Sequence, residues 1–218
     1  MRLENKHNIV IFTLLFSLLL AGPLMAVASE SSAGNGSDDI MAMLTEELKL
    51  TPDQTKQLGP KIEKFVNTID QLKADQEKEG ADPDALVKGA KKAQDEYLKA
   101  VKKILSPEQF DQYNAIKEKA VRGMFNDLAE IQMIDLQPKV GFNDEQLTQL
   151  VPILGDAMFQ VIAIAWEHAG KRLRIGQKIR IAKQLKHIQK DSRNAVSKVL
   201  TPEQLSTWDK LKEQAQKQ

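Results

Sequence analysis

Two stretches of the chain place apolar residues at alternating steps of four and three positions. The first series is Leu86, Ala90, Ala93, Tyr97, Ala100 and Ile104. The second lies 95 positions later and is Ile181, Leu185, Ile188, Ser192, Ala195 and Val199, with Ser192 as its polar member. This spacing puts each series on one side of a helix, as in a coiled coil. The pattern predicts two related amphipathic helices.

A short helix-start motif occurs four times. In each copy an apolar residue precedes a Thr, Ser or Asn, and a Gln follows three positions later. The pairs are Thr51 with Gln54, Ser106 with Gln109, Asn143 with Gln146, and Thr201 with Gln204. The side-chain oxygen of the first residue can accept a hydrogen bond from the first helical turn, and the Gln can reach back to the cap, which makes a capping box. We expect these eight residues to be structural.

The spacings between the motifs indicate that the four helix starts belong to one unit that occurs twice in the sequence. Gln54 and Gln146 are 92 positions apart, and Gln109 and Gln204 are 95 apart. Internal similarity at a fixed period is the signature of a repeat. We therefore predict an all-α fold built as a tandem repeat of antiparallel helical-hairpin modules, 38–135 and 136–218.

Glycines and prolines mark the expected turns and kinks within each module. Gly80 and Gly170 are the expected breaks between the helices of the two hairpins. Pro60 and Pro152 recur at the 92-residue offset, and each is expected to kink or restart its long helix.

The N-terminal region has the pattern of an export signal. A basic start and an apolar run from residue 9 are followed by a Gly-Pro break and by Ala26-Val27-Ala28. Residues 1–28 are therefore predicted to be a signal peptide cleaved near Ala28, followed by a flexible leader at 29–37. The alternative is an uncleaved membrane anchor through residues 9–28. Because the chain has no cysteine, the fold must be held by its core.

The paired motifs resemble those of the Spy/CpxP family of periplasmic proteins, which carry a Leu-Thr-x-x-Gln motif. The resemblance covers each half separately, and Asn143 with Gln146 matches it only as a cap. It implies a periplasmic protein of the envelope-stress type that works without ATP. Such a protein would be a chaperone that holds unfolded clients, or a regulatory partner of a membrane sensor. A structural, self-associating helical protein is the remaining alternative.

A strongly basic stretch is one candidate for a binding surface. Residues 168–190 hold eight basic residues and no acidic one, although removal of the signal peptide leaves 29 basic and 29 acidic residues of the 31 and 30 in the whole chain. Lys183, Lys186 and Lys190 lie across the helix from the apolar series, and Arg180 is a further candidate at the start of this stretch. One interpretation is a solvated face. The other is a positive surface that attracts acidic clients.

A second candidate is the stretch 153–166, which leaves almost no polar face. A helix that is apolar all round is usually buried. The alternative is an exposed client-binding patch formed by Met158, Phe159, Ile162 and Trp166, in which the flexible Met adapts to different partners.

The residue content argues against an enzyme. The chain has three His and no Cys, so zinc and di-iron helix sites lack ligands, and no metal or cofactor is expected. No nucleophile elbow, phosphate loop or dinucleotide fingerprint occurs. The basic helices carry few aromatic residues, which disfavours nucleic acid as a partner, and no small-molecule substrate is indicated. The expected partners are proteins, including further copies of the chain.

Overall fold

The computed structural model describes residues 36–78 and 80–216. The predicted signal peptide at 1–28 and the alternative anchor at 9–28 lie outside the described residues. So does most of the predicted leader, of which residues 36 and 37 begin a helix. The described residues are helical, with no strand among them, which confirms the predicted all-α class.

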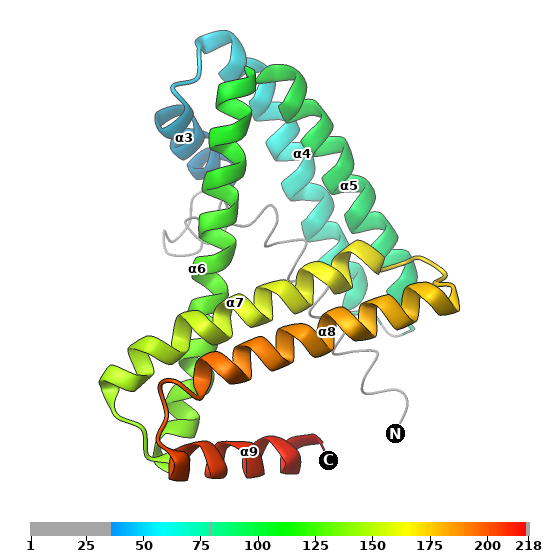
Figure 1. Ribbon diagram of the computed structural model, residues 1–218. Helices are drawn as coiled ribbons and strands as arrows, with labels where there is room; N and C mark the ends of the chain where they lie inside the picture. Colours follow the sequence, from blue (N-terminus) through cyan, green and yellow to red (C-terminus); the bar gives the residue numbers. More distant parts are fainter. Residues whose placement is uncertain (1–35, 79, 217–218) are drawn as a thin grey trace. The chain divides into compact units, whose positions relative to one another are not determined.

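Seven helices make up the described part of the chain (Figure 1). They are α3 (Gly36–Leu48), α4 (Pro52–Gln76), α5 (Pro83–Ile104), α6 (Pro107–Val140), α7 (Asp144–His168), α8 (Ile175–Val196) and α9 (Pro202–Gln216). Gly80 and Gly170 lie in the α4–α5 and α7–α8 connections with positive φ angles of 78° and 69°, so both predicted breaks occur. Pro60 and Pro152 lie inside α4 and α7, and neither proline restarts its helix.

The chain forms two compact units. The first ends at Val121 and also includes Ala165–Lys171, and the second holds Arg122–Ile164 and the chain from Arg172 onward. The boundary after Val121 lies earlier in the chain than the expected boundary between the modules 38–135 and 136–218, and both boundaries fall inside α6. In terms of the predicted repeat, α6 covers segments that are equivalent to two other helices. Its residues 107–121 match α9 at the 95-residue offset, and its residues 128–140 match α3 at the 92-residue offset.

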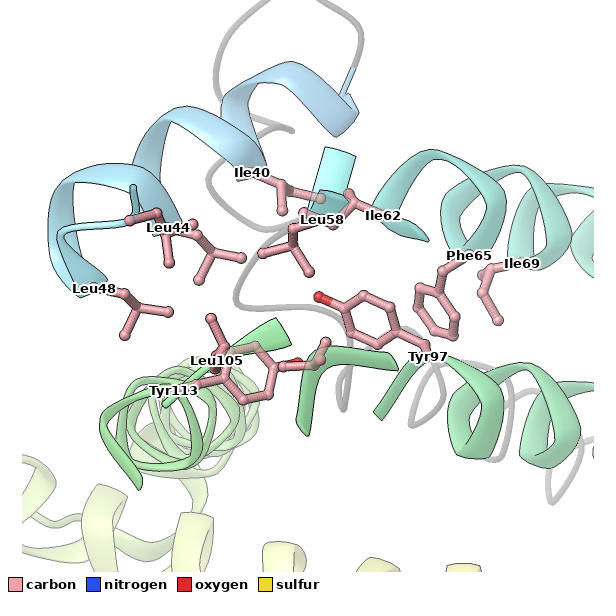
Figure 2. Close-up of a cluster of buried hydrophobic side chains, with 12 residues drawn as sticks. Ile40, Leu44, Leu48, Leu58, Ile62, Phe65, Ile69, Tyr97, Leu105 and Tyr113 are labelled. Atoms are coloured by element: carbon pink, nitrogen blue, oxygen red, sulfur yellow. The ribbon is translucent and has the colours of Figure 1, made fainter. Parts of the chain in front are cut away.

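The core of the first unit is built where α3 packs on α4 and α4 packs on α5. Its buried members include residues from all three helices and from the start of α6, and Figure 2 shows their side chains turned toward one another. The aromatic rings of Phe65 and Tyr97 stack with centroids 4.9 Å apart, and Tyr113 meets Tyr97 edge-on at 6.5 Å. Of the apolar series of α5, Tyr97 belongs to this core, Ala90 is buried, and Leu86 is buried in a separate small cluster with Leu72 and Ala81.

The second unit has a smaller core near its two helix-start motifs. Its buried members are Met133, Val140, Phe142, Leu150, Val196 and Leu200. They come from the end of α6, the first half of α7, the end of α8, and the two connections that hold Phe142 and Leu200. The backbones of α7 and α6 come close at Gly155. A Cβ atom at this position would overlap the Asn126 side chain and lie 3.0 Å from the Asn126 backbone nitrogen. Beyond this contact, most residues of α7 and α8 are half-buried or exposed.

Candidate functional site

Each of the four motifs forms a capping box. At the first, the Thr51 backbone N–H donates to Gln54 Oε1 at 3.0 Å, and the Gln54 backbone N–H donates to Thr51 Oγ1 at 3.2 Å. The other three make the same two bonds at 2.8 to 3.3 Å: Ser106 with Gln109, Asn143 with Gln146, and Thr201 with Gln204. These bonds satisfy amides that the first turn of a helix leaves unpaired.

The glutamine side chains also bind one another across each unit. Gln54 Nε2 donates to Gln109 Oε1 at 2.6 Å, and Gln109 Nε2 donates to Gln54 Oε1 at 3.2 Å. Gln54 Nε2 also donates to the carbonyl of Ile104 at 3.1 Å, and Gln109 Nε2 donates to the carbonyl of Leu48 at 3.0 Å. We call this reciprocal arrangement a glutamine clasp. Its effect is to tie the start of one helix to the end of another.

The second unit has an equivalent clasp. Gln146 Nε2 donates to Gln204 Oε1 at 2.9 Å, and Gln204 Nε2 donates to Gln146 Oε1 at 3.2 Å. The carbonyls of Val199 and Gly141 accept the remaining donations at 2.8 and 2.7 Å. Carbonyls at the end of a helix have no partner within it, so each clasp satisfies groups that would otherwise need water. The clasps are a structural device that closes one end of each unit.

The clasp was not anticipated from the sequence, although a signal was present. A capping box accepts either Glu or Gln at its last position. All four motifs use Gln, which has the same acceptor and adds two N–H donors. The uniform choice of the amide was therefore the feature that pointed to a second partner.

The candidate basic residues lie on an open part of α8. Arg180, Lys183, Lys186 and Lys190 are all exposed. Val196 is the one buried residue of this helix, and its apolar series is only half-buried or exposed. The equivalent series on α5 is largely buried. The two helices therefore have the same apolar spacing but different environments.

The expected burial of the stretch 153–166 is wrong for the described structure. Of its residues only Gly155 is buried, and Val161 is exposed. Burial would need a large apolar surface opposite α7, and α8 offers one narrow series flanked by lysines. By length and composition α7 is the one helix of the described residues that could cross a bilayer. Its first half nevertheless contributes Leu150 to the core of the second unit.

The four candidate apolar residues of α7 have different environments. Met158, Phe159 and Ile162 are half-buried on α7 in the second unit. Phe159 is engaged there, since its ring lies 6.1 Å from Phe125 and 4.6 Å from the Arg122 guanidinium carbon.

Trp166 belongs to the first unit, where it contacts α5. Its Nε1 donates to Gln94 Oε1 at 3.0 Å, and Lys91 Nζ lies 5.3 Å from the centre of its ring. Lys91 Nζ also donates to the carbonyl of Ala169 at 2.9 Å. Burial, and then the positive charge of Lys171, lower the pKa of Lys91 below its ordinary value. These bonds hold the Trp166 side chain against α5 within the first unit.

The exposed large apolar side chains of the described chain all lie in the second unit. They are Ile131, Ile134, Val161, Ile175, Ile179 and Leu185. Isolated exposed apolar residues are ordinary, but a concentration of them commonly marks an interaction surface. The first unit buries the corresponding part of its hairpin. The asymmetry between the repeats therefore identifies the second unit as the candidate binding region.

No group of three or more His, Cys, Asp or Glu residues within residues 36–78 and 80–216 is placed to hold a metal ion. An open groove of about 550 Å³ runs along α4 and is lined by that helix alone, from Pro60 to Leu72. Its charged members include Lys64, which pairs with Glu96 at 3.1 Å.

Comparison of the chain with protein-family models, curated proteins and solved structures found no match.

Proposed function

We propose that this chain is an ATP-independent, chaperone-like binding protein of the periplasm, which holds unfolding proteins on the second unit. The observation that carries the proposal is the set of exposed apolar side chains in the second unit, Val161 on α7 and Ile175, Ile179 and Leu185 on α8, together with the exposed lysines of α8. The residues assigned to clients are Met158, Val161, Ile162, Arg180, Lys183, Lys186 and Lys190. The periplasmic location rests on the export signal and on the family resemblance.

The chemistry of this surface suits clients without a fixed sequence. Unfolded chains expose apolar side chains, and their contact with Val161 and Ile162 would remove apolar area from water on both partners. Met158 is unbranched and adapts its shape to different contacts. The lysines supply long-range attraction for acidic clients, which raises the rate of encounter and weakens as salt is added. No step of this binding requires a nucleotide.

An aggregation assay with several unrelated clients tests the proposal. The chain without residues 1–28 should slow the aggregation of each client in the absence of ATP. Reversal of three α8 charges, Lys183→Glu, Lys186→Glu and Lys190→Glu, should reduce protection of acidic clients at low salt by about tenfold, because each rim charge contributes a modest part of the attraction.

A matched control makes the same charge change in the first unit. Lys92, Lys99 and Lys103 are exposed on α5, and their reversal to Glu should leave protection unchanged. Equal effects of the two variants would mean that net charge matters and the α8 surface does not. Protection of no client, with a single partner recovered by cross-linking, would instead favour a regulator of a membrane sensor.

A further inference from the structure

The end of α6 presents an exposed face that is both acidic and apolar. Asp127, Glu130, Ile131, Ile134 and Asp135 are all exposed, with 60 % of Ile131 and 52 % of Ile134 accessible. At about 100° per residue these five positions fall within roughly 140° of the helix circumference. We call them the acidic α6 face.

The outward side of α8 presents a face of the opposite charge. It is formed by Ile175, Ile179, Lys183, Lys186 and Lys190, and 78 % of Ile175 and 53 % of Ile179 is accessible. By the same count these positions span roughly 80° and lie away from the apolar series of the helix. We call them the basic α8 face. Like the acidic α6 face, it combines two neighbouring isoleucines with three charges of one sign.

The two faces do not pair with each other within one chain. Both belong to the second unit, and all ten of their residues are exposed there. Among the described residues no ion pair involves their three carboxylates or their three lysines. A single chain therefore carries two complementary faces that it leaves open.

We propose that the occupant of these faces is a second copy of this chain. The acidic α6 face of one copy docks on the basic α8 face of the other, and the reverse contact forms at the same time. Such an arrangement has twofold symmetry, in which one docking event makes two equivalent contacts and the assembly closes as a dimer. Each contact brings four isoleucines together and sets three lysines opposite three carboxylates.

The charges select a second copy over other occupants. Like charges brought together oppose association, so two basic α8 faces or two acidic α6 faces do not pair. An anionic membrane surface would attract α8 but repel the three carboxylates of α6. A partner that satisfies both faces must carry both signs in the same arrangement, and another copy of the chain does so. The isoleucines provide apolar burial, while the charges fix which helix meets which.

A charge-swap experiment tests the dimer by sedimentation velocity, without any client present. The first variant carries Asp127→Lys, Glu130→Lys and Asp135→Lys, so that both of its faces are positive. The second carries Lys183→Glu, Lys186→Glu and Lys190→Glu, so that both are negative. Each variant alone should be monomeric, with a dissociation constant raised at least about 100-fold, because facing like charges cost several kcal/mol.

Mixing the two variants should restore a dimer, since each positive face then meets a negative one. This recovery also shows that both variants are folded, because a misfolded chain would not restore the contact. Reversal of Lys92, Lys99 and Lys103 should leave the wild-type dimer intact. A wild-type chain that stays monomeric, variants that remain dimeric, or a mixture that stays monomeric would each overturn the proposal. The acidic α6 face is not part of the proposed client surface, so this result is separable from the fate of the chaperone function.

Discussion

At the residue scale, the side-chain amide of one glutamine bonds to its own helix cap, to the glutamine of a second cap and to the end of another helix. The Oε1 atom of Gln54 accepts from the Thr51 backbone and from Gln109, while its Nε2 atom donates to Ile104 and Gln109. The cap alone stabilises a helix by about 1 kcal/mol. The added bonds join helix ends 50 and 55 positions apart in the sequence. The motif thus acts in tertiary structure as well as at a helix start.

The substitution Gln54→Glu separates the two roles of this residue. Glutamate keeps the acceptor of the capping box but lacks the N–H donors, and it places a carboxylate against the carbonyl of Ile104. We expect the free energy of unfolding to fall by about 2 kcal/mol, the order of cost for leaving a buried polar group without a partner. Denaturant unfolding followed by circular dichroism measures this change.

Gln57→Glu is the matched control for this prediction. Gln57 is one turn further along α4 and is exposed, so the same change of charge should alter the stability by less than about 0.5 kcal/mol. If the two variants lose equal stability, the amide donors of the clasp contribute nothing. The motif would then be a cap alone.

The capping boxes show how much of the structure at the residue scale can be predicted from the sequence. Residue type and spacing predict the capping boxes because a cap depends on positions three residues apart. The partner of each glutamine could not be predicted in the same way, since it depends on how two distant helix starts meet. The uniform use of Gln was a usable sign. The identity of the partner carbonyls required the fold.

At the scale of the element, α5 and α8 have the same apolar spacing but differ in how far they are buried. The series of α5 is covered by α4 and the rest of the first core, whereas α8 buries only Val196. The spacing predicts the apolar side of a helix, but burial depends on what the neighbouring helix supplies. The sequence therefore predicted α5 and α8 as equivalents and missed their difference. The predicted module boundary after residue 135 and the boundary of the compact units after Val121 both fall inside α6, which is one continuous helix.

Hydrogen exchange distinguishes the environments of the two helices. α8 lacks a broad buried face, and it begins without an acidic residue in its first turn, so its backbone should open by local fluctuations. Amides of residues 179–188 should exchange at least about 100-fold faster than those of residues 90–101, which corresponds to a difference of about 2.7 kcal/mol in opening free energy. The measurement is made on monomeric protein. Equal protection of both stretches would show that α8 is covered and would remove the basis of the proposed surfaces.

At the scale of the whole molecule, the two compact units differ in how far they bury their apolar side chains. The first unit encloses a core that reaches from α3 to α6, and the second exposes its apolar side chains on α6, α7 and α8. Both proposals assign partners to the second unit, and both use the lysines of α8. A client and a second copy of the chain therefore compete for the basic α8 face. In this account the duplication provides a stable unit and a binding unit within one chain.

Site-specific photo-cross-linking to an unfolding client tests the central claim most directly. A photoreactive amino acid is placed at Val161 or Leu185 in the second unit, and at Asn67 or Lys99, which are exposed in the first. The account predicts client adducts from the two positions in the second unit and background levels from the two in the first. Adducts of equal yield from all four positions, or adducts from the first unit alone, would contradict it.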